Sequence, residues 1–230
     1  MKILIGCETS GIVRRAFAAQ GHDVWSCDLL ASEDGSNRHI IDDVRNVMRA
    51  ERWDFLAVLH PPCTRLCNSG VRWLFDPPGK IGGDHYGPAQ VEAYKRMNRE
   101  ERLAFMWAGL EDGASLFSDC WNADIPMVCL ENPRMHKHAK TRIANYQEAT
   151  QTVQPWWFGE PQFKGVGLYL RNLPPLQPTN QLVPPAPGTD EHKKWSRVHR
   201  LPPSKNRWKE RSRFFPGIGA AMAAQWGQAA

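Results

Sequence analysis

One segment of the sequence leads an apolar run directly into a residue that could do covalent chemistry. Residues 54–70 read DFLAVLHPPCTRLCNSG. The run from Phe55 to Leu59 is typical of a buried strand in a parallel sheet, and Pro61 and Pro62 cannot continue its hydrogen-bond ladder. Cys63 therefore follows the carboxyl end of a strand, where open α/β sheets bind their ligands. As a thiolate, Cys63 is a candidate nucleophile.

A second apolar strand, Ile125 to Leu130, ends in a carboxyl group, because Glu131-Asn132-Pro133 follows it. If the two strands are neighbours, the thiol and the carboxyl face one crevice. Such a pair suits addition to a pyrimidine ring: the thiolate attacks carbon 6 while the carboxyl hydrogen-bonds ring nitrogen 3. The alternative is that Glu131 only caps a following helix, and that Asn132 and Pro133 form a turn.

The elements that must position these residues alternate between strand and helix. Besides the two strands above, strand patterns occur at Lys2 to Gly6, Asp23 to Cys27, and His39 to Val44. Helical spacing of apolar residues occurs from Gly11 to Gln20 and from about 88 to 121. This order predicts an α/β fold with βαβ units and a mostly parallel, doubly wound sheet with helices on both faces. Beyond about residue 150, Trp156 to Phe158 and Val166 to Leu170 have the pattern of strands of an edge or hairpin.

Three acidic residues stand where a nucleoside-binding α/β fold needs them. Glu8 lies in the first turn (GCETSG), Asp28 follows the second strand, and Asp43 ends the third. A carboxylate after the second strand can accept both ribose hydroxyls, and one after the third can accept an adenine amino group. Gly6 and Gly11 allow the close backbone approach that a cofactor needs. The same features occur in α/β proteins of every function, so alone they select no ligand.

Length and composition fit an intracellular protein with a polyanionic partner. The chain has 230 residues, a net charge of +5 and a pI near 9.0. No apolar stretch is long enough to cross a membrane, and the N-terminus has no signal-peptide pattern. We expect a soluble cytoplasmic protein, without an obligate protein partner, whose six cysteines stay reduced.

The basic charge is concentrated between Glu191 and Arg213. This segment contains nine Lys or Arg residues and two Glu residues, which gives it a net charge of +7. Trp195 and Trp208 are interleaved with these cations, which is a pattern that suits phosphate contacts and base stacking. The alternative is a solvated proline-rich loop that the two tryptophans anchor to the core. The candidate contacts to the nucleic-acid backbone in this segment are Lys205, Arg207 and Lys209.

A metal site is a further alternative for the same residues. His60, Cys63 and Cys67 form an H-x2-C-x3-C pattern, and His136 and His138 flank the Glu131 turn. Zinc needs four ligands with short paired spacings, and the sequence has no C-x2-C. We therefore expect no metal. The other four cysteines are most simply small buried hydrophobes: Cys7, Cys27, Cys120 and Cys129.

In their order along most of the chain, these pieces resemble the motifs of the DNA (cytosine-5)-methyltransferase family. The segments that carry the resemblance are IGCETSG at 5–11, Asp28, Asp43, Pro62-Cys63, Glu131-Asn132, and the glycine-bearing helix FPGIGAAMAAQW at 215–226. The family's Gln-x-Arg-x-Arg strand is only partly matched, by Gln162, Lys164 and Val166. The chain departs from the pattern at Glu8 and Ser10, near expected glycines, and at Thr64, where a glutamine is usual.

The resemblance implies a Rossmann-like methyltransferase fold and an adenosylmethionine-dependent transfer of a methyl group to carbon 5 of cytosine in DNA. The residues that it assigns to catalysis are Cys63, Pro62, Glu131 and Asn132. Those that it assigns to the cofactor are Gly6, Glu8, Ser10, Gly11, Asp28, Asp43 and Pro61. Those near the nucleic acid are Arg65, Gln162 and Lys164. A duplex substrate requires base flipping.

The resemblance also implies a domain organisation with little sequence reading. Residues 1–175 form the catalytic and cofactor-binding core, 176–213 a proline-rich basic segment, and 214–230 a C-terminal helix that packs back on the core, within a single domain. This leaves little room for a variable target-recognition domain, so we expect low sequence specificity, as in a compact phage-type member of the family. Two alternatives remain: an enzyme that modifies free nucleotides or transfers another group, and a non-catalytic DNA-binding protein of the same fold.

Overall fold

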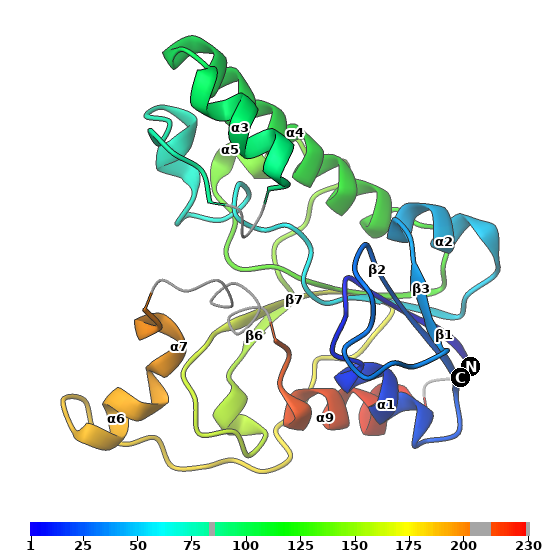
Figure 1. The fold of residues 1–230 in the computed structure, drawn as a ribbon. Helices are drawn as coiled ribbons and strands as arrows, with labels where there is room; N and C mark the ends of the chain where they lie inside the picture. The colour runs from blue at the N-terminus through cyan, green and yellow to red at the C-terminus, as the bar shows by residue number, and fades with distance from the viewer. Residues whose placement is uncertain (83–85, 203–212, 229–230) are drawn as a thin grey trace.

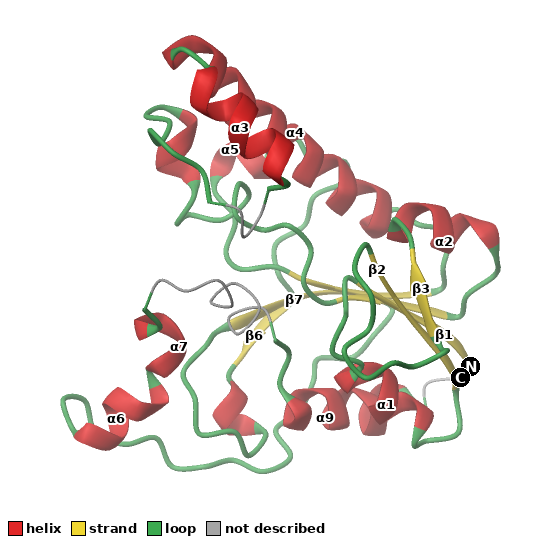
Figure 2. Ribbon diagram, in the orientation of Figure 1, coloured by secondary structure: helices red, strands yellow, loops and turns green. Residues whose placement is uncertain are grey.

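A mixed sheet with the strand order β3-β2-β1-β4-β5-β7-β6 runs through the protein (Figures 1 and 2). The computed structural model describes residues 1–82, 86–202 and 213–228. The strands are β1 (Lys2–Gly6), β2 (Asp23–Asp28), β3 (His39–Ile41), β4 (Phe55–Val58), β5 (Met127–Glu131), β6 (Gln151–Val153) and β7 (Val166–Arg171). β1 to β5 are parallel, whereas β7 is antiparallel to both β5 and β6. The predicted α/β fold with a mostly parallel sheet is confirmed.

Helices cover both faces of this sheet. In the described residues they are α1 (Ile12–Ala18), α2 (Val44–Ala50), α3 (Pro88–Arg96), α4 (Arg99–Trp121), α5 (Lys137–Lys140), α6 (Asp190–Trp195), α7 (Arg197–Arg200) and α9 (Pro216–Trp226), with 3-10 helices η1 (Val71–Leu74) and η2 (Pro155–Trp157). α2 and α4 lie on one face, α1 and α9 on the other (Figure 1). Within the ranges described, none of these helices combines the length and the apolar character needed to cross a membrane.

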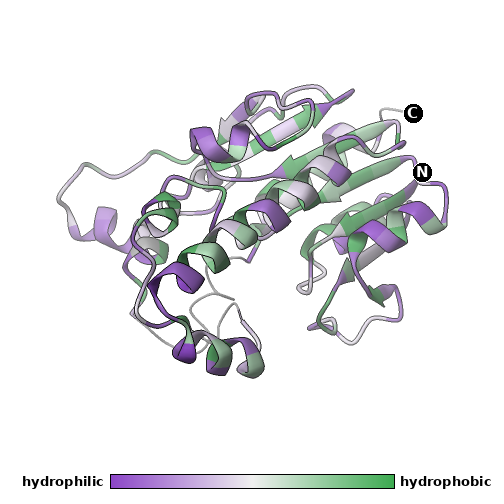
Figure 3. Cartoon of the chain, turned by 90° about the horizontal axis from the view of Figure 1, so that it is seen from above, coloured by the Kyte–Doolittle hydropathy of each residue, from purple (hydrophilic) through white to green (hydrophobic). Residues whose placement is uncertain are grey.

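Two apolar cores arise because successive residues of a strand point to opposite faces of the sheet. Along β4, Phe55 and Ala57 join the core beneath α1 and α9, whereas Leu56 and Val58 join the core beneath α2 and α4. A strand that is buried on both sides must be apolar throughout, which is why its sequence shows no alternation. Viewed from above, the strands are mostly apolar, while α4 carries both apolar and hydrophilic segments (Figure 3).

The strand order places a switch point between β1 and β4. From β1 the chain runs outward through β2 to β3, and then crosses to the other side for β4 and β5. Loops that follow the parallel strands therefore gather at one edge of the sheet, where α/β proteins bind ligands. The amino end of the antiparallel β7 reaches the same edge, because Leu168 pairs with Glu131.

The C-terminal helix α9 packs against α1 (Figure 1). A side-chain carbon at Gly219 would lie 3.2 Å from Val13 Cγ2, so a glycine at this position allows the two helices to approach closely. Trp226 ends the helix and is fully buried, with its ring edge-on to Phe55 at 6.0 Å between centroids. The helix is therefore part of the core of the sheet.

Two sequence predictions need correction. The helical section at 88–121 is two helices, because Asn98 begins α4 with a capping box: its side chain accepts from Glu101 N, and the Glu101 carboxyl accepts from Asn98 N. The predicted strand Trp156 to Phe158 is wrong. Pro155 occupies the first position of η2, where its fixed φ favours a helical turn, and the strand β6 precedes it.

We predict that Trp226→Ala lowers the free energy of unfolding by about 3–5 kcal/mol, because it removes a fully buried indole and leaves a cavity. Urea unfolding followed by circular dichroism measures this change. Val183→Ala is the control, since Val183 is 88% exposed and its truncation should change stability by less than about 0.5 kcal/mol. Equal stabilities of wild type and Trp226→Ala would show that α9 is not part of the core.

Candidate active site

The loop after β4 holds Cys63 in a tight turn. The Cys63 carbonyl accepts hydrogen bonds from Leu66 N at 2.9 Å and from Cys67 N at 3.0 Å. This geometry places Cys63 and Cys67 one helical turn apart. Cys63 is half-buried and Cys67 is buried. The candidate nucleophile is thus held by backbone hydrogen bonds and remains partly accessible.

The loops after β4 and β5 are joined into one unit. Asn68 N donates to the Arg134 carbonyl at 3.3 Å, and His136 N donates to the Leu66 carbonyl at 3.0 Å. The His136 ring also contacts the carbonyl of Arg65, at 2.7 Å from Nε2. β4 and β5 are adjacent parallel strands. Their carboxyl ends therefore bring the thiol of Cys63 and the carboxyl of Glu131 to the same edge of the sheet.

Glu131 is buried at this edge, and burial raises its pKa to about 7, although the positive charge of Lys164 opposes the shift. His60 Nδ1 lies 3.9 Å from Glu131 Oε2, beyond hydrogen-bond distance. Burial, with a smaller contribution from Lys164, holds the pKa of His60 well below its usual range, so this ring is neutral. Near neutral pH a large fraction of Glu131 is therefore protonated and able to donate a hydrogen bond.

Glu131 does not cap a helix, as the simpler interpretation of the sequence required. The following helix α5 is capped by His136, whose side chain accepts from Ala139 N. The neighbouring Asn132 is fully buried, and neither polar atom of its side chain has a hydrogen-bond partner within the described ranges. An unsatisfied buried amide costs about 1–3 kcal/mol, so its presence points to a polar group that the chain itself does not supply.

The sequence did not reveal a role for the second thiol, Cys67. A hydrogen bond from the Cys63 thiol lowers the pKa of Cys67 to about 5, and the Ser69 hydroxyl at 3.0 Å contributes. The same shared proton, together with burial, raises the pKa of Cys63. The two thiols are therefore coupled, and Cys67 is the more acidic of the pair.

Residues of the first loop make contacts within the chain. The buried Glu8 carboxylate accepts from Val13 N at 2.8 Å, Arg14 N at 3.3 Å and the Ser10 hydroxyl at 3.2 Å, so it satisfies amides at the start of α1. Gly11 precedes that helix with a φ of 64°, in the left-handed region. These contacts shape the first turn, and they occupy the carboxylate that the sequence assigned to a cofactor.

Gly6 and Asp43, which the resemblance also assigns to the cofactor, both contact α2. A side-chain carbon at Gly6 would lie 2.6 Å from Val44 Cγ2, so a larger residue would clash with α2. Asp43 does not end a strand, because β3 stops at Ile41. It caps α2 by accepting from Arg45 N, and it pairs with the Arg45 guanidinium, which lowers the pKa of the carboxyl.

Asp28, in contrast, lies beside exposed apolar side chains. Asp28 and Ile41 are partners in the parallel register of β2 and β3, and Ile41 is 62% exposed. Leu29, which follows Asp28, is 71% exposed, and the next residue, Leu30, is exposed as well. Burial raises the pKa of Asp28, although Leu30 N donates to its carboxylate at 3.0 Å. A carboxylate next to bare apolar surface fits a nucleoside, which has ribose hydroxyls and a flat base.

The residues assigned to nucleic acid divide into three groups. Arg65 is buried, its Nη2 donates to the Tyr86 hydroxyl at 2.7 Å, and its Nε has no described hydrogen-bond partner. Lys164 lies close enough to influence both Glu131 and His60, and Gln162 Oε1 is buried without a described partner. Lys205, Arg207 and Lys209 lie outside the described residues.

Two sequence expectations about the basic segment and the metal can be compared with the structure. Trp195 is buried against Phe163 at 5.3 Å between ring centroids, so it anchors α6 and does not offer its face to a base. His60, Cys63 and Cys67 do not gather into a metal site: across the described ranges, no three His, Cys, Asp or Glu side chains cluster in that way.

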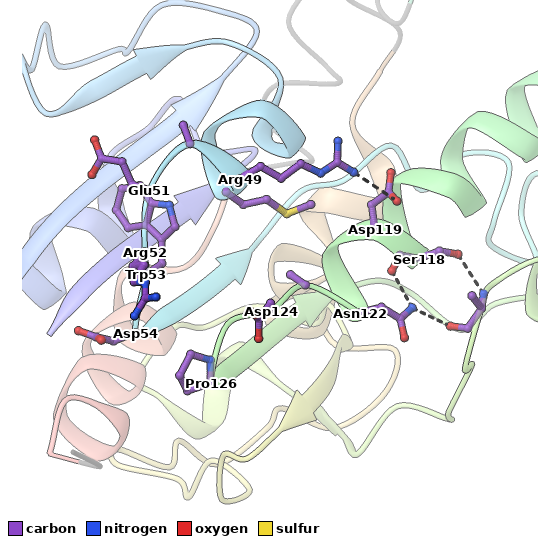
Figure 4. A pocket seen from close by; sticks show the side chains of 14 residues that line it. Arg49, Glu51, Arg52, Trp53, Asp54, Ser118, Asp119, Asn122, Asp124 and Pro126 are labelled. Atoms are coloured by element: carbon purple, nitrogen blue, oxygen red, sulfur yellow. Dashed lines mark hydrogen bonds and ion pairs between the residues drawn. The ribbon is translucent and has the colours of Figure 1, made fainter.

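A hollow of about 1100 Å³ lies at the opposite edge of the sheet (Figure 4). It is lined by residues before β4 and β5, such as Trp53, Asp54 and Pro126, and by Arg49 and Asp119, which pair at 3.7 Å. None of the residues with candidate chemistry lines it. The amino ends of the strands form this edge, so the hollow is not where α/β sheets place their reaction chemistry.

We predict that the pH dependence of stability reports the buried Glu131. Its folded pKa of about 7 exceeds the ordinary value of 4.5, so between these pH values the folded state binds more protons than the unfolded state. The stability therefore falls as pH rises through this window. Glu131→Gln removes this loss, so its stability relative to wild type should increase by roughly 3 kcal/mol between pH 4.5 and 8.

Urea unfolding at a series of pH values measures the difference. Glu100→Gln, at an exposed position on α4, is the control for removal of a carboxylate. A Glu131→Gln stability that tracks wild type at every pH would contradict the raised pKa.

Comparisons with known proteins add no family to this geometry. No protein-family model matches the chain, and no curated protein matches it. The chemistry of the site must therefore be inferred from its own residues, from their arrangement at the carboxyl edge of the sheet, and from the order of the motifs along the chain.

Proposed function

We propose that this protein transfers a methyl group from adenosylmethionine to carbon 5 of cytosine in DNA. The observation that carries the proposal is that Cys63, in the loop after β4, and Glu131, the last residue of β5, lie at the carboxyl ends of two adjacent parallel strands, next to the switch point of the sheet. A thiol and a partly protonated carboxyl on one side of the sheet, beside the unsatisfied amide of Asn132, suit a planar ring with polar edges.

The chain's residues have distinct roles in this reaction. Cys63, as thiolate, adds to carbon 6 of the ring, and the electron pair of the 5,6 double bond moves toward carbon 5 and the polar edge. Glu131 donates a hydrogen bond to ring nitrogen 3 and stabilises the charge that develops there. After carbon 5 has gained the methyl group, loss of its proton restores the double bond and expels the Cys63 thiolate.

Cys67 and Asn132 complete the set around the reacting ring. Because Cys67 is the more acidic thiol of the pair, its thiolate can accept the proton of Cys63 as Cys63 attacks the ring. The amide of Asn132 can bind a polar group on the edge of the base, where its own hydrogen-bonding capacity is unmet.

The residues near Asp28 fit the nucleoside part of adenosylmethionine, which supplies an electrophilic methyl group when bound. Asp28 can accept the ribose hydroxyls, while Leu29 and Ile41 offer apolar surface for the adenine ring. Asp28 and Ile41 end β2 and β3, and Cys63 lies after β4, so β1 separates the two groups at the switch point.

A second candidate is an enzyme that acts on a free pyrimidine nucleotide. It is favoured by the described residues between β7 and α9, which form only the short helices α6 and α7 and no domain that reads sequence. The same thiol chemistry serves both substrates. Activity on deoxycytidine monophosphate, without activity on DNA, would select this candidate.

We predict that Cys63→Ser abolishes turnover and leaves adenosylmethionine affinity nearly intact, because the alcohol is a far weaker nucleophile of similar size. Wild type should form a denaturation-resistant adduct with DNA that carries 5-fluorocytosine, and Cys63→Ser should not. Cys67→Ser is the matched control: it should form the adduct more slowly, because only the proton-sharing partner is lost. A fully active Cys63→Ser would remove Cys63 from the mechanism.

We predict that Asp28→Ala weakens adenosylmethionine binding by about 1–3 kcal/mol, the usual effect of losing a charge-assisted hydrogen bond. Isothermal titration calorimetry measures the affinity. Asp23→Ala removes an exposed aspartate from the other end of the same strand and should bind as wild type does. Equal affinity of Asp28→Ala and Asp23→Ala would mean that the cofactor lies elsewhere.

A further inference from the structure

Three aromatic rings from separate segments meet on the outside of the protein. Phe75 follows η1, Trp107 belongs to α4, and His138 belongs to α5. Their ring centroids are 5.9 Å apart for Phe75 and Trp107, and 5.5 Å apart for both other pairs. Phe75 is nevertheless 55% exposed, which is unusual for a phenylalanine in such a cluster. We call this cluster the aromatic face.

Several cations lie next to the aromatic face. Arg99 Nη2 donates to the Phe75 carbonyl at 3.4 Å, and the Arg142 guanidinium stacks over Trp107 at 5.0 Å. Arg72 and Lys137 are close neighbours of Phe75 and His138 in the chain. Arg142 is paired with Glu111, but Arg72, Arg99, Lys137 and the nearby Arg134 have no carboxylate within 4.0 Å in the part of the chain described. Four exposed cations are thus available to an anionic partner.

The aromatic face continues directly from the candidate active site. Residue 68 of the Cys63 loop bonds to the carbonyl of Arg134, and η1 begins three residues later. Cys67 and Met135 pair as an isolated antiparallel bridge between the same loops. Figure 1 shows α3, α5 and the first turns of α4 together, beyond the strands. Hydrogen bonds and a bridge therefore join the loops of the candidate active site to the segments that carry the aromatic face.

We infer that the aromatic face and its four exposed cations, Arg72, Arg99, Arg134 and Lys137, bind the DNA strand that flanks the target cytosine. This inference rests on the proposed function. The cations contact phosphates, and the exposed Phe75 ring provides a surface on which an unpaired base stacks. Neither contact reads base edges, so the surface binds many sequences, as a chain with little room for a recognition domain requires.

The test compares two triple variants by fluorescence anisotropy with labelled duplexes of unrelated sequence. Arg72→Ala, Arg134→Ala and Lys137→Ala together remove three cations from the face. Arg38→Ala, Arg49→Ala and Arg52→Ala remove three exposed cations elsewhere, with the same change in net charge. We expect the face variant to lose about tenfold or more in affinity for every duplex, and its salt slope to fall by roughly 0.9 for each lost phosphate contact. The control variant should bind almost as wild type does.

A separate Phe75→Ala variant should weaken binding of single-stranded DNA while leaving the salt slope unchanged, because stacking releases no counterions. Thermal unfolding and adenosylmethionine affinity should match wild type for all variants. If the face variant keeps its DNA affinity and slope, or the control loses as much, the inference is wrong.

The outcomes also separate this inference from the proposed function. If wild type methylates DNA and the face variant does so with the same KM, the DNA-binding role of the aromatic face is contradicted and the proposed function is supported. If wild type binds DNA through the aromatic face but forms no adduct and transfers no methyl group, the proposed function is contradicted and the DNA-binding role of the face is supported. If wild type binds no DNA, this inference fails, and activity on deoxycytidine monophosphate would then support the nucleotide-level enzyme.

Discussion

The parallel pairing of β4 with β5 is the constraint on which the site depends. Its register places Val58 level with Leu130, so that both chains leave the sheet at the same height and their loops can bond to each other. Without this pairing, Cys63 and Glu131 would be residues far apart in sequence with no common ligand. The buried apolar residues of both strands, Phe55–Val58 and 127–130, fix the pairing, because a slip of one residue would exchange the side chains between two differently shaped cores.

The polar groups at this edge are arranged at a cost to stability that the two cores must offset. Among the described residues, Glu131 has no charged partner at hydrogen-bond distance and the Asn132 amide has no partner, and His60 is buried and neutral. An apolar residue at each of these positions would give a more stable fold, because burial of a polar group without a partner costs free energy. Buried polar groups without described partners, such as the Asn132 amide, are typical of a site that binds a ligand.

The long connection between β4 and β5 carries both core-forming helices and an exposed surface that could contact a partner. It contains η1, α3 and α4, and through α4 and η1 it contributes the largest share of the core on its side of the sheet. The same connection extends outward from the site and carries exposed cations and aromatic rings. Rigid packing of α4 against the sheet would hold such a surface in a fixed relation to Cys63, so one segment can provide both structure and contact with a partner.

The sequence by itself determined the central strands β1, β2, β4 and β5, and the position of Cys63 and Glu131 at the carboxyl ends of β4 and β5, because apolar runs and prolines act locally. It did not reveal β6, and it misassigned Trp156 to Phe158 as a strand. The tertiary structure decided how several polar groups are used. The Glu8 carboxylate is occupied by the amides of α1, Trp195 is buried against Phe163, and Cys67 shares a proton with Cys63. The bare apolar surface of Ile41 beside Asp28 likewise follows from the pairing of two strands. These outcomes depend on burial and on contacts between segments that are distant in the sequence. Local sequence patterns predict neither of these properties.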